Sequence, residues 1–178
     1  IEQAKSMVEN GAGIIDIGGE STRPGASAVS VNDELNRVIP VIEALKNEIN
    51  VPISIDTSKP EVMEQAISSG ALIINDVNAL RAEGALEMAA KLKVDICLMH
   101  MQGNPRTMQK NPSYADVVED IKSFFKERIN ACQESGIELS SITLDPGFGF
   151  GKNLGHNIAL LKNLSEFHEF GVSILAGL

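Results

Sequence analysis

The chain has 178 residues, which suits one domain with a sizeable core and makes two full domains unexpected. Hydrophobic residues make up 43% and charged residues 22%, so the composition is that of a globular domain and speaks against disorder. The net charge of −9, with no basic cluster in the sequence, makes nucleic acid a poor partner.

The two cysteines, Cys97 and Cys132, belong to no CxxC motif and no Cys/His cluster. We therefore expect neither a disulfide framework nor a zinc site, and we expect Cys97 to be a small buried hydrophobic residue. No apolar stretch is long enough to span a bilayer, and the chain opens on an amphipathic helix pattern instead of a signal peptide. These features predict a cytoplasmic protein with no membrane partner.

Helical and extended hydrophobic patterns alternate along the chain. The first helix should end at Gly11, and a loop rich in Gly, Ser and Pro covers residues 18–30. Pro40 predicts a kink in the second helix, and Ser58, with Pro60 in the first turn, predicts a capping box at the start of the third. In chain order the predicted helices cover residues 1–10, 31–49, 58–70, 83–92, 114–135 and 156–168, and the predicted strands cover residues 13–17, 51–56, 72–75, 95–99, 142–145 and 172–176.

The predicted strands are short and apolar, which is typical of a parallel sheet buried on both faces by helices. A doubly wound open sheet and a TIM-type barrel both fit this pattern. Five strands end in a polar residue, and such residues would meet at the mouth of a barrel, whereas an open sheet concentrates its site at one switch point. We therefore favour an α/β fold of the TIM-type (β/α)8 class, as one domain over residues 1–178. The five residues are Asp16, Asp56, Asn75, His100 and Asp145.

Only six strands are predicted, so a barrel of eight would lack its first and its last strand. Either the sequence is a fragment of a longer chain, or the fold is not a closed barrel. We expect the natural polypeptide to extend at both ends.

Three segments carry candidate chemistry. In the glycine-rich loop at residues 18–25, Thr22 and Arg23 could hold an anionic oxygen, although an ordinary flexible loop with a solvated arginine explains this segment, taken alone, slightly better. Asp56 offers acceptors to adjacent N–H groups of a heterocycle, and Asn75 could bind the edge of the ring that carries both donors and acceptors. The alternative is that strand-end Asp and Asn residues cap the next helix, but for Asp56 this is disfavoured because Ser58 is the better cap.

The third segment, residues 145–152, has alternating glycines but fits neither a Walker loop nor a dinucleotide fingerprint. A mobile loop that closes its aromatic side chains on a flat ligand and a buried turn packed by Phe148 and Phe150 are equally good interpretations. His100 could line a site or make a structural hydrogen bond. His156 and His168 are expected on the surface, and no metal ligand is assigned.

Five motifs stand out along the chain: DIGGESTRPG at residues 16–25, IDTSKP at 55–60, IIND at 73–76, LMHMQGNP at 98–105 and DPGFGFGK at 145–152. Taken together, these motifs resemble the signatures of dihydropteroate synthases, and the resemblance covers the whole chain. Other pterin-binding barrels, such as methyltetrahydrofolate methyltransferases, do not combine the first of these motifs with the last.

The resemblance implies an eight-stranded barrel and a transferase of folate biosynthesis. This reaction displaces pyrophosphate from a 6-hydroxymethyl-7,8-dihydropterin with the amine of p-aminobenzoate. It implies Mg2+ bound mainly through the substrate pyrophosphate, and we expect a homodimer. The implied catalytic residues beside the pyrophosphate are Thr22 and Arg23; the implied pterin contacts are Asp56, Asn75, Val77, Met99, Asp145, Phe150 and Gly177; and the implied p-aminobenzoate contacts are Thr22, Arg23, Pro24 and Phe150.

Several basic groups and an asparagine that the family uses on its first, seventh and eighth strands have no counterpart in this sequence. Two other functions therefore stay open for these 178 residues. One is a different pterin-barrel enzyme that transfers a methyl group. The other is a pterin-binding module or fragment without catalytic activity.

Overall fold

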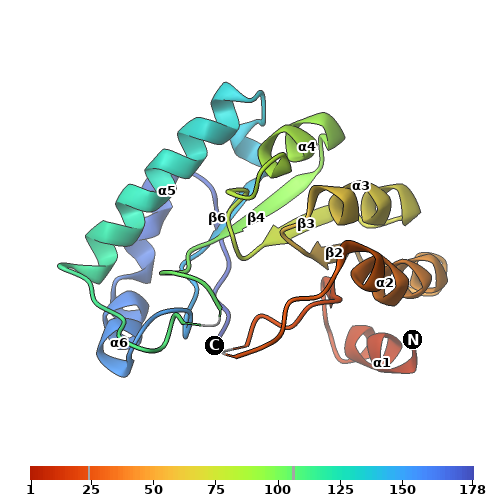
Figure 1. Cartoon of the computed structure of the whole chain (residues 1–178), viewed down its shortest axis with the longest axis horizontal. Helices are drawn as coiled ribbons and strands as arrows, with labels where there is room; N and C mark the ends of the chain where they lie inside the picture. The colour runs from red at the N-terminus through yellow and green to blue at the C-terminus, as the bar shows by residue number, and fades with distance from the viewer. Residues whose placement is uncertain (24, 106) are drawn as a thin grey trace.

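The computed structural model describes residues 1–23, 25–105 and 107–178. Helices and strands alternate along the chain (Figure 1). The helices are α1 (Glu2–Glu9), α2 (Val31–Leu45), α3 (Pro60–Ser69), α4 (Ala85–Leu92), α5 (Val117–Glu134) and α6 (Leu154–Lys162). The strands are β1 (Ile15–Gly18), β2 (Ile53–Asp56), β3 (Ile73–Asp76), β4 (Asp95–Met99), β5 (Ile142–Asp145) and β6 (Ser173–Ile174), and 3-10 helices cover Leu139–Ser141 and Leu164–Phe170.

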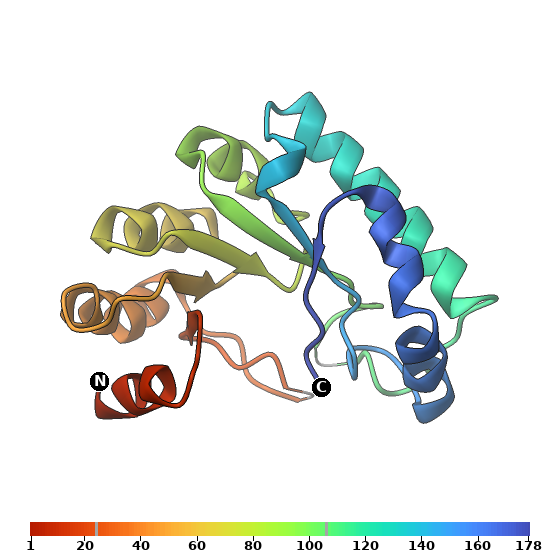
Figure 2. The ribbon, with the colours of Figure 1, turned by 180° about the vertical axis from the view of Figure 1, so that it is seen from behind.

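The strands form one parallel sheet in the order β1-β2-β3-β4-β5-β6. The order follows the chain without a reversal, so the sheet has no topological switch point, and the doubly wound alternative is wrong. The helices form an arc around one face of the curved sheet, as successive βα units do in a TIM-type barrel (Figures 1 and 2). The predicted fold class is confirmed, with six strands in the part of the chain that the structure describes.

Strand register separates the two faces of the sheet. Ile55 pairs with Ile74, and Leu98 pairs with Leu144; all four are fully buried in the main core beneath the helices. Because side chains alternate along a strand, the intervening positions point to the opposite face, which we call the inner face. Its members among the described residues include Asp16, Asp56, Asn75, Cys97, Met99, Thr143 and Asp145.

The inner face corrects one expectation, because it is lined by polar groups where strands apolar on both faces were predicted. Asp16 is exposed, and Asp56 and Asn75 are only partly buried. The sequence pattern did not reveal this face, because each strand has only one or two polar residues among its β-branched residues.

Local signals at helix ends were predicted with mixed success. The helix α2 begins at a Ser30 cap that accepts from the Asp33 amide, and it continues through Pro40. The predicted capping box at Ser58 is wrong: α3 begins after Lys59 with no side-chain cap, and the Ser58 hydroxyl donates instead to Asp76. No helix within the described residues is long and apolar enough to cross a membrane.

Candidate functional site

The inner face brings three of the predicted polar residues, Asp16, Asp56 and Asn75, together on β1, β2 and β3. Asp56 and Asn75 are register partners, and the Asn75 amide donates to the Asp16 carboxylate at 3.1 Å. Gly18 lies beside them on β1, where a Cβ atom would come within 3.2 Å of Asp56 Oδ2. Glycine at this position therefore leaves room for the Asp56 carboxylate at the mouth of the sheet.

The Asp56 carboxyl sits in surroundings that oppose its ionisation. Burial raises its pKa to about 7, and the charges of Asp16, Asp76, Glu34 and Glu20 act in the same direction. A neighbouring group of ligand N–H donors would stabilise the ionised form. The site is therefore suited to a ligand that presents N–H groups.

Asp145 lies farther along the inner face, at the end of β5. Its Oδ1 accepts from the Gly147 amide at 2.7 Å, and a Cβ atom at Gly177 would lie 3.9 Å from its Oδ2. Burial raises the pKa of Asp145 to about 6, although the Gly147 amide and Lys152 oppose the shift. The predicted residues Asp145 and Gly177 therefore lie close together, 32 positions apart in the sequence.

An apolar cluster stands beside these carboxylates. Met99 pairs with Asp145 in the sheet, and it forms a buried group with Met101 and Met108. Val77 and Phe150 pack against this group. Three residues expected to surround a flat ring, Val77, Met99 and Phe150, are thus brought to one place.

The turn between β5 and α6 is held by a buried lysine. The Lys152 ammonium donates to the carbonyl oxygens of Gly147 at 2.8 Å, Phe150 at 3.0 Å and His100 at 3.2 Å, and it lies 3.0 Å from His100 Nδ1. Burial lowers the pKa of Lys152 to about 7, and burial together with Lys152 and Arg81 lowers that of His100 to about 3. Of the two alternatives for His100, the structure shows the structural hydrogen bond.

The same turn has close backbone packing that explains its glycines. Gly147 has φ +69°, and a Cβ atom there would lie 2.1 Å from the His100 carbonyl oxygen. Phe148 packs against the main core and Phe150 against the methionine cluster. These contacts match the buried-turn interpretation of residues 145–152 better than that of a free loop.

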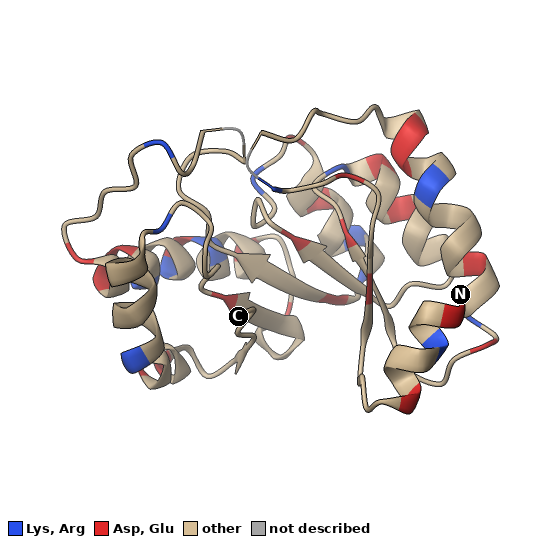
Figure 3. Cartoon of the chain, turned by 90° about the horizontal axis from the view of Figure 1, so that it is seen from below, with Lys and Arg blue, Asp and Glu red and all other residues tan. Residues whose placement is uncertain are grey.

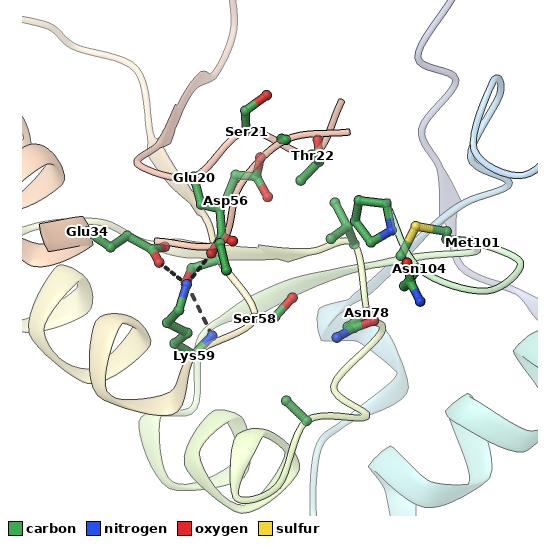
Figure 4. Close-up of a pocket in the computed structure, with 16 residues that line it drawn as sticks. Glu20, Ser21, Thr22, Glu34, Asp56, Ser58, Lys59, Asn78, Met101 and Asn104 are labelled. Atoms are coloured by element: carbon green, nitrogen blue, oxygen red, sulfur yellow. Dashed lines mark hydrogen bonds and ion pairs between the residues drawn. The ribbon is translucent and has the colours of Figure 1, made fainter. Parts of the chain in front are cut away.

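A cavity of about 490 Å³ opens next to Asp56, between the loops that follow β1, β2, β3 and β4 (Figure 4). Thr22, Asp56 and Val77 line it, but Asn75, Met99, Asp145, Phe150 and Gly177 do not, so the predicted site divides into this cavity and the adjoining inner face. Arg23 is exposed, and Pro24 lies outside the described residues. The lining residues are Glu20, Ser21, Thr22, Ala26, Ala28, Glu34, Asp56, Thr57, Ser58, Lys59, Val77, Asn78, Ala82, Met101, Asn104 and Pro105.

The sequence analysis missed an ionic cluster in the wall of this cavity. The Lys59 ammonium is bonded to Glu20 in the β1–α2 loop and to Glu34 on α2 (Figure 4). Glu34 is completely buried, together with Val38 and Ile42 on the same helix face. Its spacing from those apolar residues is the signal that could have marked it, because a carboxylate on a buried face needs a partner.

The sequence matches the family model described as "Pterin binding enzyme" over residues 1–178. The chain belongs to this family of pterin-binding enzymes.

Similar proteins extend this assignment. The chain is 53% identical over 178 residues to dihydropteroate synthase of Escherichia coli K12, covering 100% of this chain and 63% of that protein. The structure of Yersinia pestis dihydropteroate synthase with a sulfonamide drug complex superposes with a TM-score of 0.98 at 51% identity, covering 99% of this chain and 64% of the other. Xanthomonas albilineans dihydropteroate synthase with 4-aminobenzoic acid gives a TM-score of 0.94 at 50% identity, covering 99% and 63%. The chain thus spans somewhat less than two thirds of the length of these relatives.

Proposed function

We propose that this chain is the pterin-binding core of a dihydropteroate synthase. The reaction joins 6-hydroxymethyl-7,8-dihydropterin pyrophosphate to p-aminobenzoate and yields 7,8-dihydropteroate and pyrophosphate. The observation that carries the proposal is the inner face, where Asp56, Asn75 and Asp145 stand beside the apolar wall of Val77, Met99 and Phe150. The identity to dihydropteroate synthases over the whole chain supports the same reaction.

The pterin ring would be held by complementary hydrogen bonds. Asp56 and Asp145 supply acceptors for ring N–H groups, whereas the amide of Asn75 supplies both a donor and an acceptor. Val77, Met99 and Phe150 would pack against the ring, and Gly177 would leave space beside Asp145. Carboxylates near the ring also tolerate the positive charge that develops on it as pyrophosphate leaves.

The β1–α2 loop would bind the pyrophosphate and p-aminobenzoate. Thr22 lines the cavity beside Asp56, and Arg23 follows it in the chain. A cationic guanidinium and a hydroxyl at this place can stabilise the negative charge on the departing pyrophosphate. The amine of p-aminobenzoate, held by Thr22, Arg23, Pro24 and Phe150, needs only to be aligned with the reacting carbon, so positioning supplies much of the rate.

We further propose that Mg2+ enters with the substrate pyrophosphate. The described residues contain no group of three or more His, Cys, Asp or Glu side chains arranged to hold a metal ion. When bound, the ion would neutralise part of the negative charge on the phosphate oxygens.

The protein's partners and location are inferred from its cysteines and its charges. Both cysteines are free and buried, which is consistent with a reducing cytoplasm. Lys and Arg are spread over several helices and loops in Figure 3. The net charge of −9 makes nucleic acid a poor partner. We expect a homodimer that binds small-molecule substrates, and light scattering of the purified natural polypeptide tests this assembly.

The decisive experiment incubates the purified natural polypeptide that carries this chain with dihydropterin pyrophosphate and p-aminobenzoate. We expect stoichiometric release of dihydropteroate and pyrophosphate. Methyl transfer without pyrophosphate release would favour a different pterin-barrel enzyme, and pterin binding without turnover would favour a binding module.

In the active protein, Arg23→Ala should lower turnover but leave the affinity for a pterin without pyrophosphate nearly unchanged. Equal losses of turnover and of pterin affinity would show that the role of Arg23 is misassigned.

A further inference from the structure

The ionic cluster of Lys59, Glu20 and Glu34 joins three separate elements. Lys59 is the residue before α3, Glu34 lies in the first turn of α2, and Glu20 lies in the β1–α2 loop. The side chains of Lys59 and Glu20 are 24% and 30% exposed, whereas that of Glu34 is 1% exposed. The ion pairs are therefore partly shielded from water, which strengthens them relative to surface pairs.

Glu20 also organises the loop in which it lies. While one of its oxygens is bonded to Lys59, Oε1 accepts from the Val29 amide at 3.3 Å and so links the two ends of the loop. Next to it, the Gly19 carbonyl accepts from Arg37 on α2 at 2.8 Å. Thr22 lies only two residues after Glu20 in the same loop. Its position therefore depends on how Glu20 is held.

The charges of the cluster argue against a direct role for Lys59 in binding pyrophosphate. Its ammonium is already bonded to two carboxylates, so the three groups together carry a net charge of −1 when ionised. A phosphate oxygen would have to displace one carboxylate and approach the other. Such an approach costs more than binding to an unpaired cation.

We propose that Lys59 is a positioning residue that ties the β1–α2 loop to α2 and thereby sets where Thr22 and Arg23 stand beside the cavity. The proposal rests on the proposed function for its substrate readout, because Thr22 and Arg23 serve the p-aminobenzoate and pyrophosphate side of the reaction. The anchor itself is a feature of the fold that can be measured without turnover.

The choice of variants follows from the burial of Glu34. Its Oε1 has no hydrogen-bond partner among the described residues, so Lys59→Met alone would leave a buried carboxylate without its counter-charge and destabilise the fold. The double variant Lys59→Met/Glu34→Gln removes both charges and leaves Glu20 in place. Glu20→Gln breaks the loop's own ion pair and keeps the pair between Lys59 and Glu34.

A matched control is available on the neighbouring helix surface. Lys91 on α4 pairs with Glu64 on α3 at 2.7 Å, but these side chains are 66% and 39% exposed and lie outside the cavity lining. Lys91→Met makes the same chemical change in an ion pair that anchors no loop. It should leave the kinetics, the pterin affinity and the loop amides unchanged.

The experiment combines steady-state kinetics, pterin calorimetry and hydrogen exchange on the natural polypeptide. We expect Glu20→Gln and the double variant each to raise the KM for p-aminobenzoate roughly tenfold, because the loop loses its alignment. The dissociation constant for a pterin without pyrophosphate should stay within about twofold. In the double variant, the Val29 amide should exchange roughly tenfold faster, because Glu20 is no longer held in place.

Two results would overturn the proposal. One is unchanged Val29 exchange and unchanged KM for p-aminobenzoate in the double variant. The other is a loss of affinity for dihydropterin pyrophosphate in the double variant with no effect of Glu20→Gln, which would make Lys59 a direct pyrophosphate ligand. If the unmodified protein forms no dihydropteroate, the proposed function fails by itself, and the exchange of the Val29 amide still decides whether Lys59 anchors the loop.

Discussion

At the scale of single residues, the carboxyls of Asp56 and Asp145 are held at strand ends in surroundings that oppose their charge. Burial is the largest cause of the raised pKa of each group. Such groups weaken the fold at neutral pH and become favourable when a ligand offers hydrogen-bond donors. The raised pKa values at these two strand ends are therefore consistent with the proposed binding site.

The first prediction concerns Asp56 and pH. Its pKa of about 7 lies above the ordinary value of 3.8, so the folded protein binds more protons than the unfolded chain between these values. The free energy of unfolding therefore falls as the pH rises from about 4 to 7. Asp56→Asn cannot ionise and should stabilise the ligand-free protein by an amount on the order of 2 kcal/mol at pH 8 and by much less at pH 4.

Urea denaturation of both proteins across this pH range measures the effect. Asp95→Asn, an exposed residue at the opposite end of a strand, provides the control. A stability difference between Asp56→Asn and the parent protein that does not change with pH would contradict the prediction.

The second prediction concerns Asp145 as a pterin ligand. Asp145→Ala should weaken pterin binding by about 2–3 kcal/mol, since a buried ligand N–H group loses its acceptor. Isothermal calorimetry with a pterin gives the affinity, and Asp95→Ala should bind as the parent protein does. An unchanged affinity in Asp145→Ala would exclude Asp145 from the pterin site.

At the scale of elements, the turn between β5 and α6 depends on one side chain. Lys152 bonds to carbonyl oxygens from its own turn and from His100 after β4. We predict that Lys152→Met destabilises the protein by about 2–4 kcal/mol, because several buried acceptors lose their donor. Chemical denaturation measures this loss, and Lys126→Met, at an exposed position on α5, is the matched control. Equal stability of the two variants would show that the turn does not need the lysine.

The element scale also shows what the sequence could reveal. The strands at residues 95–99 and 142–145 were predicted with their observed ends. The second of them is followed directly by the turn residues Pro146 and Gly147. The role of Lys152 was not predicted, since its acceptor at His100 lies 52 residues away. The Ser58 cap failed for the same kind of reason: its hydroxyl bonds to Asp76, 18 residues ahead, in preference to its own helix.

At the scale of the whole molecule, the sequential order of the strands determines which strand-end residues become neighbours. Polar residues at strand ends were enough to predict that Asp16, Asp56 and Asn75 lie together, because parallel strands end on the same edge of a sheet. They did not predict that His100 bonds to Lys152 instead. The same reasoning could not predict the ionic cluster of Lys59, Glu20 and Glu34. Lys59 meets Glu34 and Glu20 across 25 and 39 residues, and no local spacing encodes such contacts.

The last prediction concerns the edges of the sheet. Among the described residues, β1 and β6 each pair with only one neighbouring strand. Unpaired edges promote association, so residues 1–178 expressed by themselves should form oligomers or aggregates and should turn over little substrate. Size-exclusion chromatography with light scattering and a dihydropteroate assay test this expectation. A monodisperse monomer with the turnover of the natural polypeptide would refute it.

The rate at which the buried Lys152 amine reacts with an acylating reagent can report how often the turn between β5 and α6 opens. With 3% of its surface exposed, this amine is shielded from acylating reagents while the turn between β5 and α6 is closed, whereas Lys126 on α5 is open to them. Acylation of Lys152 then requires the turn to open, so its labelling rate relative to Lys126 counts those openings. Phe150 lies on the same turn. A pterin that packs against Phe150 should therefore lower the rate of Lys152 acylation without contacting the lysine itself.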